Sequence, residues 1–455
     1  MFAKINFHDE FYQKLKLLVL PITMQQFMLA LVSATDAIML GAVSQTSLSA
    51  VSLAGQIQFV LNLFISGISA GSGIMAAQYW GKKDAASIEE VMPIALRTNL
   101  IFSGAFTVFA AVAPEVLMRI FTSDPALIES GAVYLRAVSL SYLLCGISQI
   151  YLILLKNTGY ATVSSRISCT AVVVNIICNA ILIYGLLGLP ALGIQGAAYA
   201  TVAARLVELV WSYLETKQSG RVQIIWKKMF HAADAVLTKD FWRYTTPVLG
   251  AALVWGIAYV SYSVIMGHMG SDAVAANSIT TIAKNMLSCL IRGVSGGAGV
   301  LIRNLLGAGE LDKAKVYGGR LTRMAIVVGM TTGGLLMLIS PLIVRFAPLS
   351  ETAAEYLQYM LIFCGCNIMA QSVNTTVLDG IFCAGGDSKF DMKGNLGAMW
   401  CFSVPFGFFA AFVLKWPVMV VYCIVNLDEI VKIPAVYLHY KKYIWVRNIT
   451  VQEDA

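Results

Sequence analysis

"GISAGSGIMAAQYWGKKD" at residues 67–84 and "GVSGGAGVLIRNLLGAGE" at residues 293–310 are two copies of one pattern. A shift of 226 positions superimposes them without a gap. The same shift pairs further positions along both halves: Pro21 with Pro247, Gly41 with Gly267, Ala50 with Ala276, Gly67 with Gly293, Ser69 with Ser295, Gly71 with Gly297, Gly73 with Gly299 and Gly81 with Gly307. Small residues that let helices pack closely would explain either string alone, but not their shared register. The sequence therefore contains a tandem repeat.

The composition places both copies in a membrane. Of 455 residues, 58% are hydrophobic and only 13% are charged, and the mean hydropathy is +0.74. These values exclude a soluble globular protein. Long apolar stretches without alternation predict helices, not barrel strands. The charged N-terminus has no small-residue cleavage site after a short apolar core, so we expect no removable signal peptide.

We predict an all-α polytopic membrane protein with two six-helix bundles related by pseudo-twofold symmetry along the membrane normal. Hydropathy gives twelve transmembrane spans, at about 15–42, 47–80, 91–113, 127–155, 163–188, 192–215, 241–268, 273–306, 316–346, 352–383, 389–414 and 417–440. The predicted domains are an N-terminal bundle (1–216), a cytoplasmic amphipathic linker (217–240), a C-terminal bundle (241–440) and a cytoplasmic tail (441–455).

The net charge of +7 follows this topology. Lys and Arg gather in alternate connections, for example at Lys82, Lys83, Lys227 and Lys228, whereas the opposite connections hold little beyond Arg119, Arg345 and Lys415. The positive-inside rule then puts both termini in the cytoplasm of a multi-pass inner (plasma) membrane protein. The charge does not indicate a nucleic-acid partner.

Asp36 interrupts the apolar stretch "LVSATDAIML" at residues 31–40. A carboxylate within a membrane is costly unless it takes up a proton or pairs with a cation, so Asp36 is the predicted proton- or cation-coupling residue. Pro21 lies about 22 Å away along the same helix and, like its repeat partner Pro247, is a predicted hinge. The alternative is a static structural hydrogen bond. The repeat equivalent of Asp36 is Tyr262, so the carboxylate occurs in one half only.

Other polar or aromatic residues are predicted to line a substrate cavity. Asn175 and Asn179 lie one helical turn apart on a single face of the fifth span. Asparagines also join membrane helices as structural contacts, and the sequence leaves that alternative open. The remaining candidates are Gln25, Gln26, Tyr134, Thr201, Tyr262 and Trp255.

The C-terminal half carries charges of both signs at membrane depth: Lys284, Arg292, Asp379, Asp428, Glu429 and Lys432. Opposite charges in a membrane usually pair, and Asp428 with Lys432 has the i, i+4 spacing for it. The alternative is that an unpaired member contacts a charged substrate or a coupling ion.

Several segments together resemble the multidrug and toxic compound extrusion (MATE) family of the MOP flippase superfamily over essentially the whole chain. They are "TDAIMLGAVSQTSLSAVSLAGQI" (35–57), "GISAGSGIMAAQYWGKKD" (67–84), "LPALGIQGAAYATVAAR" (189–205), "GHMGSDAVAANSI" (267–279) and "GVSGGAGVLIRNLLGAGELDKA" (293–314). The resemblance implies a V-shaped exporter that expels organic, often cationic, compounds in exchange for H+ or Na+.

Within this family, the spacing from Pro21 to Asp36 is similar to the proton-coupled DinF-type branch. Asn175 and Asn179 fall where that branch has an asparagine and an aspartate. The NorM-type branch has a glutamate where this chain has Trp255, and its tenth-helix acid is absent at about Ser372. The resemblance therefore favours H+ over Na+.

We predict a secondary active multidrug efflux transporter that works by alternating access. One alternative is a lipid-linked oligosaccharide flippase, in which Lys284 and Arg292 would bind pyrophosphate, although the other candidate arginines, Arg97, Arg136 and Arg205, are scattered. A second is a non-transporting membrane receptor or scaffold.

Enzyme motifs are missing from the sequence. It has no phosphate-binding glycine loop or nucleophile elbow, and its nine cysteines lack zinc-site spacing. We therefore predict no enzymatic activity, no metal and no cofactor. The expected partners are small organic substrates and membrane lipids, with no nucleic acid, and we expect a monomer.

Overall fold

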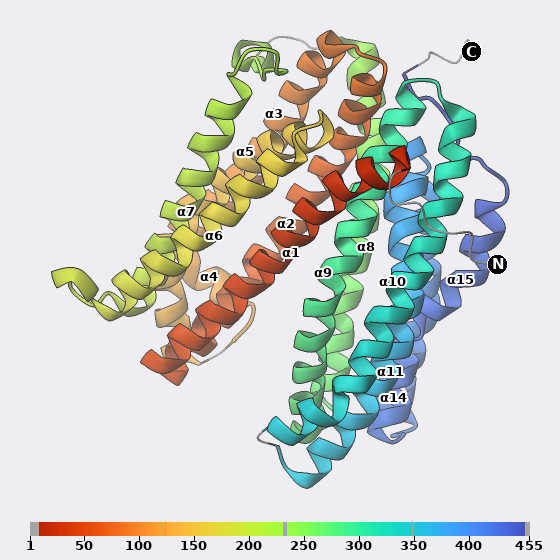
Figure 1. The fold of residues 1–455 in the computed structure, drawn as a ribbon. Helices are drawn as coiled ribbons and strands as arrows, with labels where there is room; N and C mark the ends of the chain where they lie inside the picture. Colours follow the sequence, from red (N-terminus) through yellow and green to blue (C-terminus); the bar gives the residue numbers. More distant parts are fainter. Residues whose placement is uncertain (1–8, 123, 231–233, 348, 451–455) are drawn as a thin grey trace. The chain divides into compact units, whose positions relative to one another are not determined.

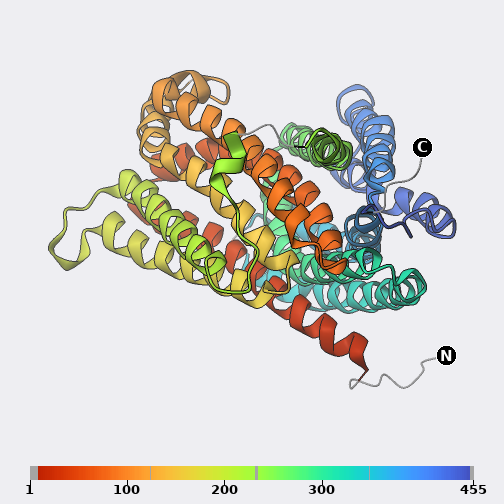
Figure 2. The ribbon, with the colours of Figure 1, turned by 90° about the horizontal axis from the view of Figure 1, so that it is seen from above.

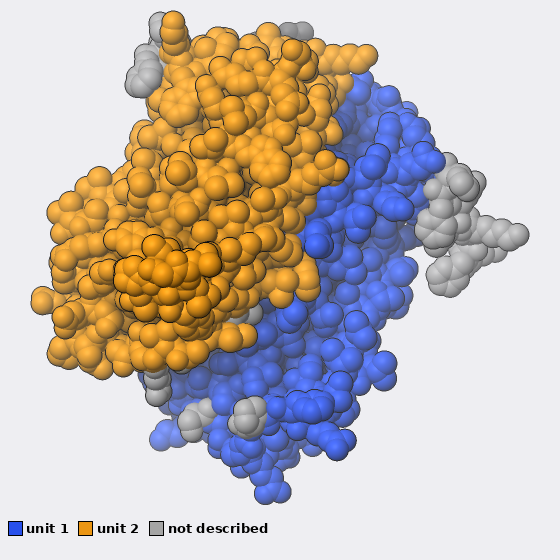
Figure 3. All heavy atoms as spheres, turned by 60° about the vertical axis from the view of Figure 1, so that its left-hand side comes forward, with its two compact units in different colours: residues 1–26, 250–455 blue, residues 27–249 orange. Residues whose placement is uncertain are grey.

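The computed structural model describes residues 9–122, 124–230, 234–347 and 349–450. These residues form helices and connecting segments and contain no strand (Figure 1, Figure 2). The chain divides into two compact units, unit 1 (residues 1–26 and 250–455) and unit 2 (residues 27–249), which Figure 3 colours separately.

Seven helices lie wholly or partly in unit 2 before the second half of the chain begins: α1 (Glu10–Val43), α2 (Gln45–Gly81), α3 (Ala85–Val112), the short α4 (Pro114–Arg119), α5 (Pro125–Asn157), α6 (Ala161–Tyr184) and α7 (Gly193–Thr216). Two 3-10 turns, η1 (Leu186–Gly188) and η2 (Trp226–Phe230), follow α6 and α7. The longest of these helices, α2, has 37 residues, well beyond the roughly 20 that cross a hydrocarbon core.

The second half contains α8 (Ala235–Gly267), α9 (Ser271–Gly307), α10 (Leu311–Phe346), α11 (Glu351–Thr375), α12 (Ser388–Asn395), α13 (Val404–Phe408), α14 (Val418–Val425) and α15 (Asp428–Tyr440). Ten helical stretches of the described chain have the length and apolar composition to cross a membrane. The other two predicted spans correspond to α7, which carries Arg205 and Glu208, and to the pair α14 and α15, which breaks at Asn426 and Leu427. The predicted all-α fold with twelve spans is confirmed.

Two helices are shared between the units. Residues 10–26 of α1 belong to unit 1, and the remainder of α1 belongs to unit 2. Residues 235–249 of α8 belong to unit 2, and the remainder belongs to unit 1. The units therefore differ from the predicted domains 1–216 and 241–440. The first part of α1 packs with the second half of the chain, and the first part of α8 packs with the first half. The two changes occur at nearly equivalent repeat positions, since Leu249 pairs with Thr23 under the 226-residue shift.

The paired glycines explain how each shared helix end packs. In unit 2, a Cβ at Gly67 would lie 2.8 Å from the Cα of Leu249 on α8. In unit 1, a Cβ at the equivalent Gly293 would lie 2.9 Å from the Cα of Thr23 on α1. Leu249 and Thr23 are themselves repeat partners, so the two halves make the same contact. Glycine is required because a side chain would hold the backbones apart.

Gly71 and Gly297, one turn further along, repeat this arrangement. A Cβ at Gly71 would lie 2.6 Å from the Cα of Thr245, and a Cβ at Gly297 would lie 2.8 Å from Cγ2 of Val19. Thr245 and Val19 are again equivalent under the 226-residue shift. The shared register of the glycine strings is thus a repeated helix contact.

Polar contacts and ring packing fix the start of α1 in unit 1. Phe11 is fully buried, and its ring meets that of Tyr317 edge to face at 4.8 Å. Asp9 accepts a hydrogen bond from the Phe11 backbone N–H at 3.1 Å and from Arg320 Nη1 at 2.6 Å. That N–H and the guanidinium hold the pKa of Asp9 below its ordinary value.

The predicted linker and tail are both packed on helices. In the linker, Trp226 donates from Nε1 to the Tyr151 hydroxyl at 2.7 Å, and Lys228 pairs with Glu90 at 2.5 Å, so residues 217–230 belong with unit 2. In the tail, Trp445 is fully buried in the core cluster of α9 and α10. Residues 231–233 of the predicted linker and residues 451–455 of the predicted tail lie outside the described residues.

The π-helical turns of the described residues all lie in the second half. The chain forms π-helical turns at η3 (Thr376–Phe382), η5 (Leu396–Ser403) and η6 (Phe409–Val413), and a 3-10 turn at η4 (Cys383–Gly385). π-Helical turns re-aim side chains and are frequent at functional sites. Asp379 lies in the first of them.

We expect Gly71→Ala to destabilise the protein by about 1–3 kcal/mol, because the added methyl group would press on the backbone at Thr245. The matched control is Gly55→Ala on the same helix, where a Cβ meets nothing within 4 Å. That control should be neutral or slightly stabilising, since alanine favours helix over glycine. Thermal unfolding of the purified protein in detergent measures both. Equal melting temperatures for the two variants would contradict the close contact.

Candidate functional site

Asp36 on α1 and Asn179 on α6 are in direct contact within unit 2. Asn179 donates from Nδ2 to Asp36 Oδ1 at 2.5 Å, across 143 positions of sequence. Asp36 is partly buried and Asn179 is 1% exposed. Within the described chain, Asp36 has no ion-pair partner among Lys, Arg or His. The carboxyl group is thus shielded yet bound to a neutral partner.

Neutral polar groups extend the contact across three helices. Asn179 Nδ2 also donates to Asn175 Oδ1 at 3.1 Å, and Asn175 Nδ2 donates to Thr201 Oγ1 on α7 at 3.4 Å. The buried Tyr134 on α5 interacts with Thr201 and lies near Asp36. Four of the predicted lining residues, Tyr134, Asn175, Asn179 and Thr201, therefore gather around the predicted coupling residue. We call these five residues the Asp36 cluster.

The other predicted lining residues do not join this cluster. Gln25, which is buried, and Gln26 belong with Pro21 to the end of α1 that lies in unit 1. Trp255 and Tyr262 lie on the unit 1 part of α8, where the Trp255 ring stacks on Tyr259 at 5.5 Å. Pro247 is buried in the unit 2 part of α8. Both predicted hinge prolines therefore lie in the exchanged helix ends.

Lys432 is the centre of a second polar cluster, in unit 1. Its ammonium group lies 3.0 Å from Glu429 Oε1 and 3.6 Å from Asp428 Oδ2, so the predicted pairing of Asp428 with Lys432 is present. All three side chains are at least 87% buried, with exposed fractions of 5% for Lys432, 8% for Asp428 and 13% for Glu429. Opposite charges at this depth offset the cost of burial only when they stay together.

Sequence reasoning missed three members of this second cluster. Lys432 donates to Asn395 Oδ1 at 3.2 Å, and Asn395 donates to Asp391 Oδ1 at 3.1 Å. Asn374 donates to Glu429 Oε2 at 2.8 Å. The i, i+4 spacing of Asp391 and Asn395 at the start of the eleventh predicted span was the available signal. With Asp428, Glu429 and Lys432, they form what we call the Lys432 cluster.

The remaining charged candidates of the second half are more open. Lys284 is partly buried and donates to Asn367 Oδ1 at 3.5 Å. Arg292 and Asp379 are exposed, and neither forms an ion pair within the described chain. Among the described residues, no hydrogen bond or ion pair joins them to the Lys432 cluster. Asp379 nevertheless lies close enough to interact electrostatically with Asp391, Glu429 and Lys432, and Lys284 does so with Asp428 and Glu429.

Two arginines considered for a flippase already have acidic partners in unit 2. Arg205 Nη1 lies 2.7 Å from Glu208 Oε2 inside the bundle, where Ser148 also donates to that carboxylate at 3.0 Å. Arg136 pairs with Glu115 at 2.6 Å. Glu208 itself, 1% exposed, was missed by sequence reasoning, although its i, i+3 spacing from Arg205 was visible. These partners leave neither guanidinium free for a pyrophosphate.

Comparison with known proteins gives a consistent result. The MatE family model matches residues 21–181 and 247–409, so its two matches begin at the repeat partners Pro21 and Pro247. The uncharacterized transporter YisQ of Bacillus subtilis is 22% identical over 417 residues, which cover 91% of this chain and 90% of the relative. The probable multidrug resistance protein YoeA of the same organism is 21% identical and covers 86% and 84%.

A solved structure shows the same fold. It is a MOP superfamily transporter from Pyrococcus furiosus, described as having a binding pocket of reverse polarity that suggests a different function. This chain is 18% identical to it, with a TM-score of 0.86 over 95% of each chain.

We expect Lys432→Met to destabilise the protein by about 3–5 kcal/mol, because it would leave two buried carboxylates without their cation. Thermal unfolding in detergent measures the loss. Adding Asp428→Asn and Glu429→Gln to the same variant should recover most of the stability, since the buried charges are then removed together. Lys393→Met, at an exposed lysine of the neighbouring α12, is the control and should change little. A similar loss in both lysine variants would show that charge pairing is not the cause.

Proposed function

Since the chain belongs to the MatE family of membrane transporters, we propose that it is a secondary active multidrug efflux antiporter. It exchanges H+ for organic, often cationic, compounds by alternating access. It lies in the inner (plasma) membrane with both termini in the cytoplasm. The name of YoeA, a probable multidrug resistance protein, supports export of drug-like compounds.

The observation that carries the proposal is the state of Asp36. Its carboxyl group is shielded, has no cationic partner in the described chain, and accepts a hydrogen bond from the Asn179 amide. A carboxylate locked against a lysine or arginine would keep its charge throughout a transport cycle. A carboxylate held by a neutral amide can take up and release a proton, which is what coupling to a pH gradient requires.

The side-chain amide of Asn179 can change its hydrogen bonding when Asp36 takes up a proton. In the structure its Nδ2 donates to Asp36, while its own Oδ1 is buried and has no hydrogen-bond partner. A protonated carboxyl group needs an acceptor for its O–H, and a side-chain amide presents a donor and an acceptor on one rotatable group. Rotation of the Asn179 amide would satisfy the protonated acid, so uptake of one proton changes the contact between α1 and α6.

The coupling cycle follows from this contact. Deprotonated Asp36 keeps the N-terminal cavity open to substrate from the cytoplasm. After outward opening, a proton enters, the contact with α6 changes, and α1 bends at Pro21 to close the cavity. Pro21 cannot donate a backbone hydrogen bond, so the helix is weakest there.

A proton fits the Asp36 cluster better than Na+. Sodium would need several oxygen ligands, but Asn175 Oδ1 and Thr201 Oγ1 are already engaged in hydrogen bonds, which leaves only the Asp36 carboxylate and Asn179 Oδ1 among the oxygens of the cluster's amides and carboxylate. A proton needs only one carboxyl oxygen and one acceptor. The lipid-linked oligosaccharide flippase is the less favoured alternative, because Arg136 and Arg205 are paired with glutamates. A non-transporting receptor or scaffold would show no flux at all.

We expect Asp36→Asn to abolish pH-driven export while the protein stays folded, because the neutral side chain cannot bind and release a proton. The measurement is export of an ethidium-like cation by purified protein in liposomes, first under an imposed pH gradient and then under an imposed Na+ gradient. Transport by the variant at the wild-type rate under the pH gradient would falsify the scheme.

Asp312→Asn is the control for this experiment. Asp312 lies in the first turn of α10, its side chain is 97% exposed, and its partner Lys315 is also at the surface. It should transport like the wild type. Flux that follows the Na+ gradient and ignores the pH gradient would replace the proton by sodium in the cycle. Drug susceptibility of cells that express the chain separates an exporter from a flippase.

A further inference from the structure

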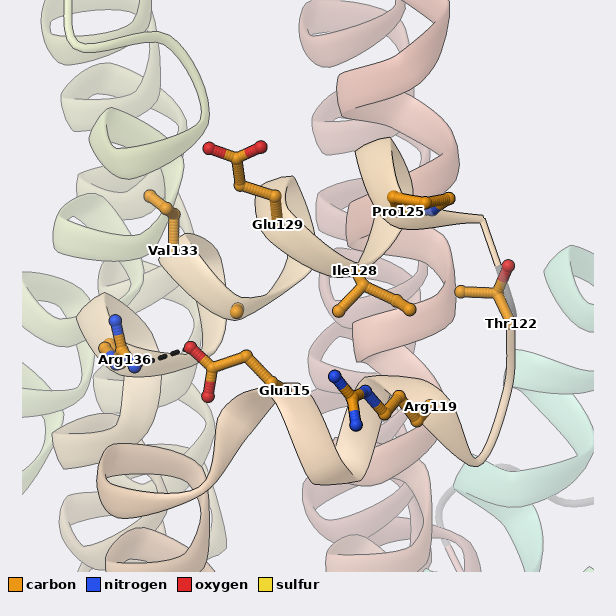
Figure 4. A pocket seen from close by; sticks show the side chains of 9 residues that line it. Glu115, Arg119, Thr122, Pro125, Ile128, Glu129, Val133 and Arg136 are labelled. Atoms are coloured by element: carbon orange, nitrogen blue, oxygen red, sulfur yellow. Dashed lines mark hydrogen bonds and ion pairs between the residues drawn. The ribbon is translucent and has the colours of Figure 1, made fainter.

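A cavity of about 720 Å³ lies between α4 and the first turns of α5, within unit 2. Figure 4 shows the side chains that line it: Glu115, Arg119, Thr122, Pro125, Ile128, Glu129, Ala132, Val133 and Arg136. Its volume is in the range of ligand pockets. None of these residues belongs to the Asp36 cluster, so the cavity is separate from the proposed coupling site.

The cavity has a firm base because α4 is packed against α5. Met118 of α4 is fully buried. A Cβ at Gly131 of α5 would lie 2.6 Å from Met118 Sδ, so the glycine leaves the space in which the methionine sits. Pro114 begins α4 and is also buried. Glu115 and Arg119 are therefore presented from a helix that is held in place.

The cavity has equal numbers of acidic and basic side chains, but only one ion pair forms between them. It contains two glutamates and two arginines. Arg136 pairs with Glu115 at 2.6 Å (Figure 4). Arg119 and Glu129 are exposed and form no ion pair among the described residues. The cavity thus offers one free guanidinium and one free carboxylate to a ligand that carries both charges.

The surroundings indicate where this ligand comes from. Val112, Val116 and Ile120, on and beside α4, are 75%, 61% and 69% exposed. In a membrane protein, exposed aliphatic side chains of this kind contact lipid tails. Arg119 is one of the few basic residues in the connections opposite the Lys-rich ones. A charged cavity next to such a surface lies where lipid headgroups meet the acyl chains.

We propose that this cavity binds the headgroup of a zwitterionic phospholipid with a primary amine, of the phosphatidylethanolamine class. Arg119 recognises the phosphate, since guanidinium groups match phosphate oxygens in geometry and charge. Glu129 accepts hydrogen bonds from the ammonium group. The unpaired Glu129 carboxylate disfavours a purely anionic headgroup, and a quaternary ammonium has no N–H to donate.

The test is lipid binding by the full-length protein, purified in detergent and stripped of lipid, followed by native mass spectrometry. Phosphatidylethanolamine, phosphatidylglycerol and phosphatidylcholine with the same acyl chains are added back at equal concentration. We expect phosphatidylethanolamine to bind at least about fivefold more tightly than either of the others. Equal binding of the three lipids, or a preference for phosphatidylglycerol, would overturn the proposal.

The double variant Arg119→Gln, Glu129→Gln should lose this preference, whereas the matched double variant Arg345→Gln, Glu355→Gln should keep it. Arg345 and Glu355 are exposed residues of α10 and α11 without an ion pair in the described chain. Retention of the preference by the cavity variant would also overturn the proposal. If that variant does not fold, the selectivity of the wild-type protein decides.

A further arm separates a lipid from a free metabolite of the same chemistry. Soluble phosphoethanolamine at millimolar concentration is added to the protein carrying phosphatidylethanolamine. We expect no displacement, because the lipid is also held by its acyl chains on the aliphatic surface of α4. Displacement of the lipid would show that the cavity recognises the free headgroup, against the proposal.

Discussion

The close contact of helix backbones at paired glycines is the constraint on which the rest of the structure depends. At Gly67 and Gly71 in one half, and at Gly293 and Gly297 in the other, any side chain would overlap a residue of the neighbouring helix. In a membrane, helices gain little by hiding apolar surface from lipid, so association depends on how closely they fit. These glycines allow the first part of α1 to pack with the second half of the chain and the first part of α8 to pack with the first half.

The two halves differ in how they hold their polar clusters, although they share this packing. The first half pairs its buried Glu208 with Arg205, but it places Asp36 among neutral amides and hydroxyls, without a cationic partner in the described chain. The second half surrounds Lys432 with Asp428, Glu429 and Asn395. A buried ion pair keeps its charges because separating them is costly, whereas an isolated acid can change its charge. The structural asymmetry supports a proton site in the first half and a fixed polar core in the second.

Much of the fold could be predicted from sequence, because hydropathy and the repeat are local or periodic signals. The twelve spans are predicted from hydropathy, and the pairing of Asp428 with Lys432 is predicted from their i, i+4 spacing on a helix. Asp36, Asn175 and Asn179 could be singled out as polar residues in apolar helices. Their direct contact could not be predicted, because Asp36 and Asn179 are 143 positions apart and meet only when α1 packs on α6.

Other features also depended on tertiary packing. The sequence places the boundary at the basic stretch 217–240, but the compact units divide inside α1 and α8, where composition does not change. Close packing of the two backbones decides which helix each helix end contacts, as where Thr23 of α1 lies against Gly293 of α9. The π-helical turns have no periodic signal either, and they lie in apolar stretches that are read from sequence as ordinary helix. Burial of Trp445 likewise depends on space that Gly318 and Gly385 leave free.

The continuity of α1 gives the proposed proton site a route to the rest of the molecule. One helix of 34 residues carries Asp36 in unit 2 and Pro21, Thr23 and Val19 in unit 1. A shift of α1 at Asp36 requires either a bend within that helix or a movement of the end that packs on Gly293 and Gly297. Because a side chain cannot be accommodated at those glycines, the packed end resists local adjustment. Pro21, where the backbone lacks a hydrogen-bond donor, lies within this packed end, between Val19 and Thr23, so the proposed bend at Pro21 requires the packed end to move against Gly293 and Gly297.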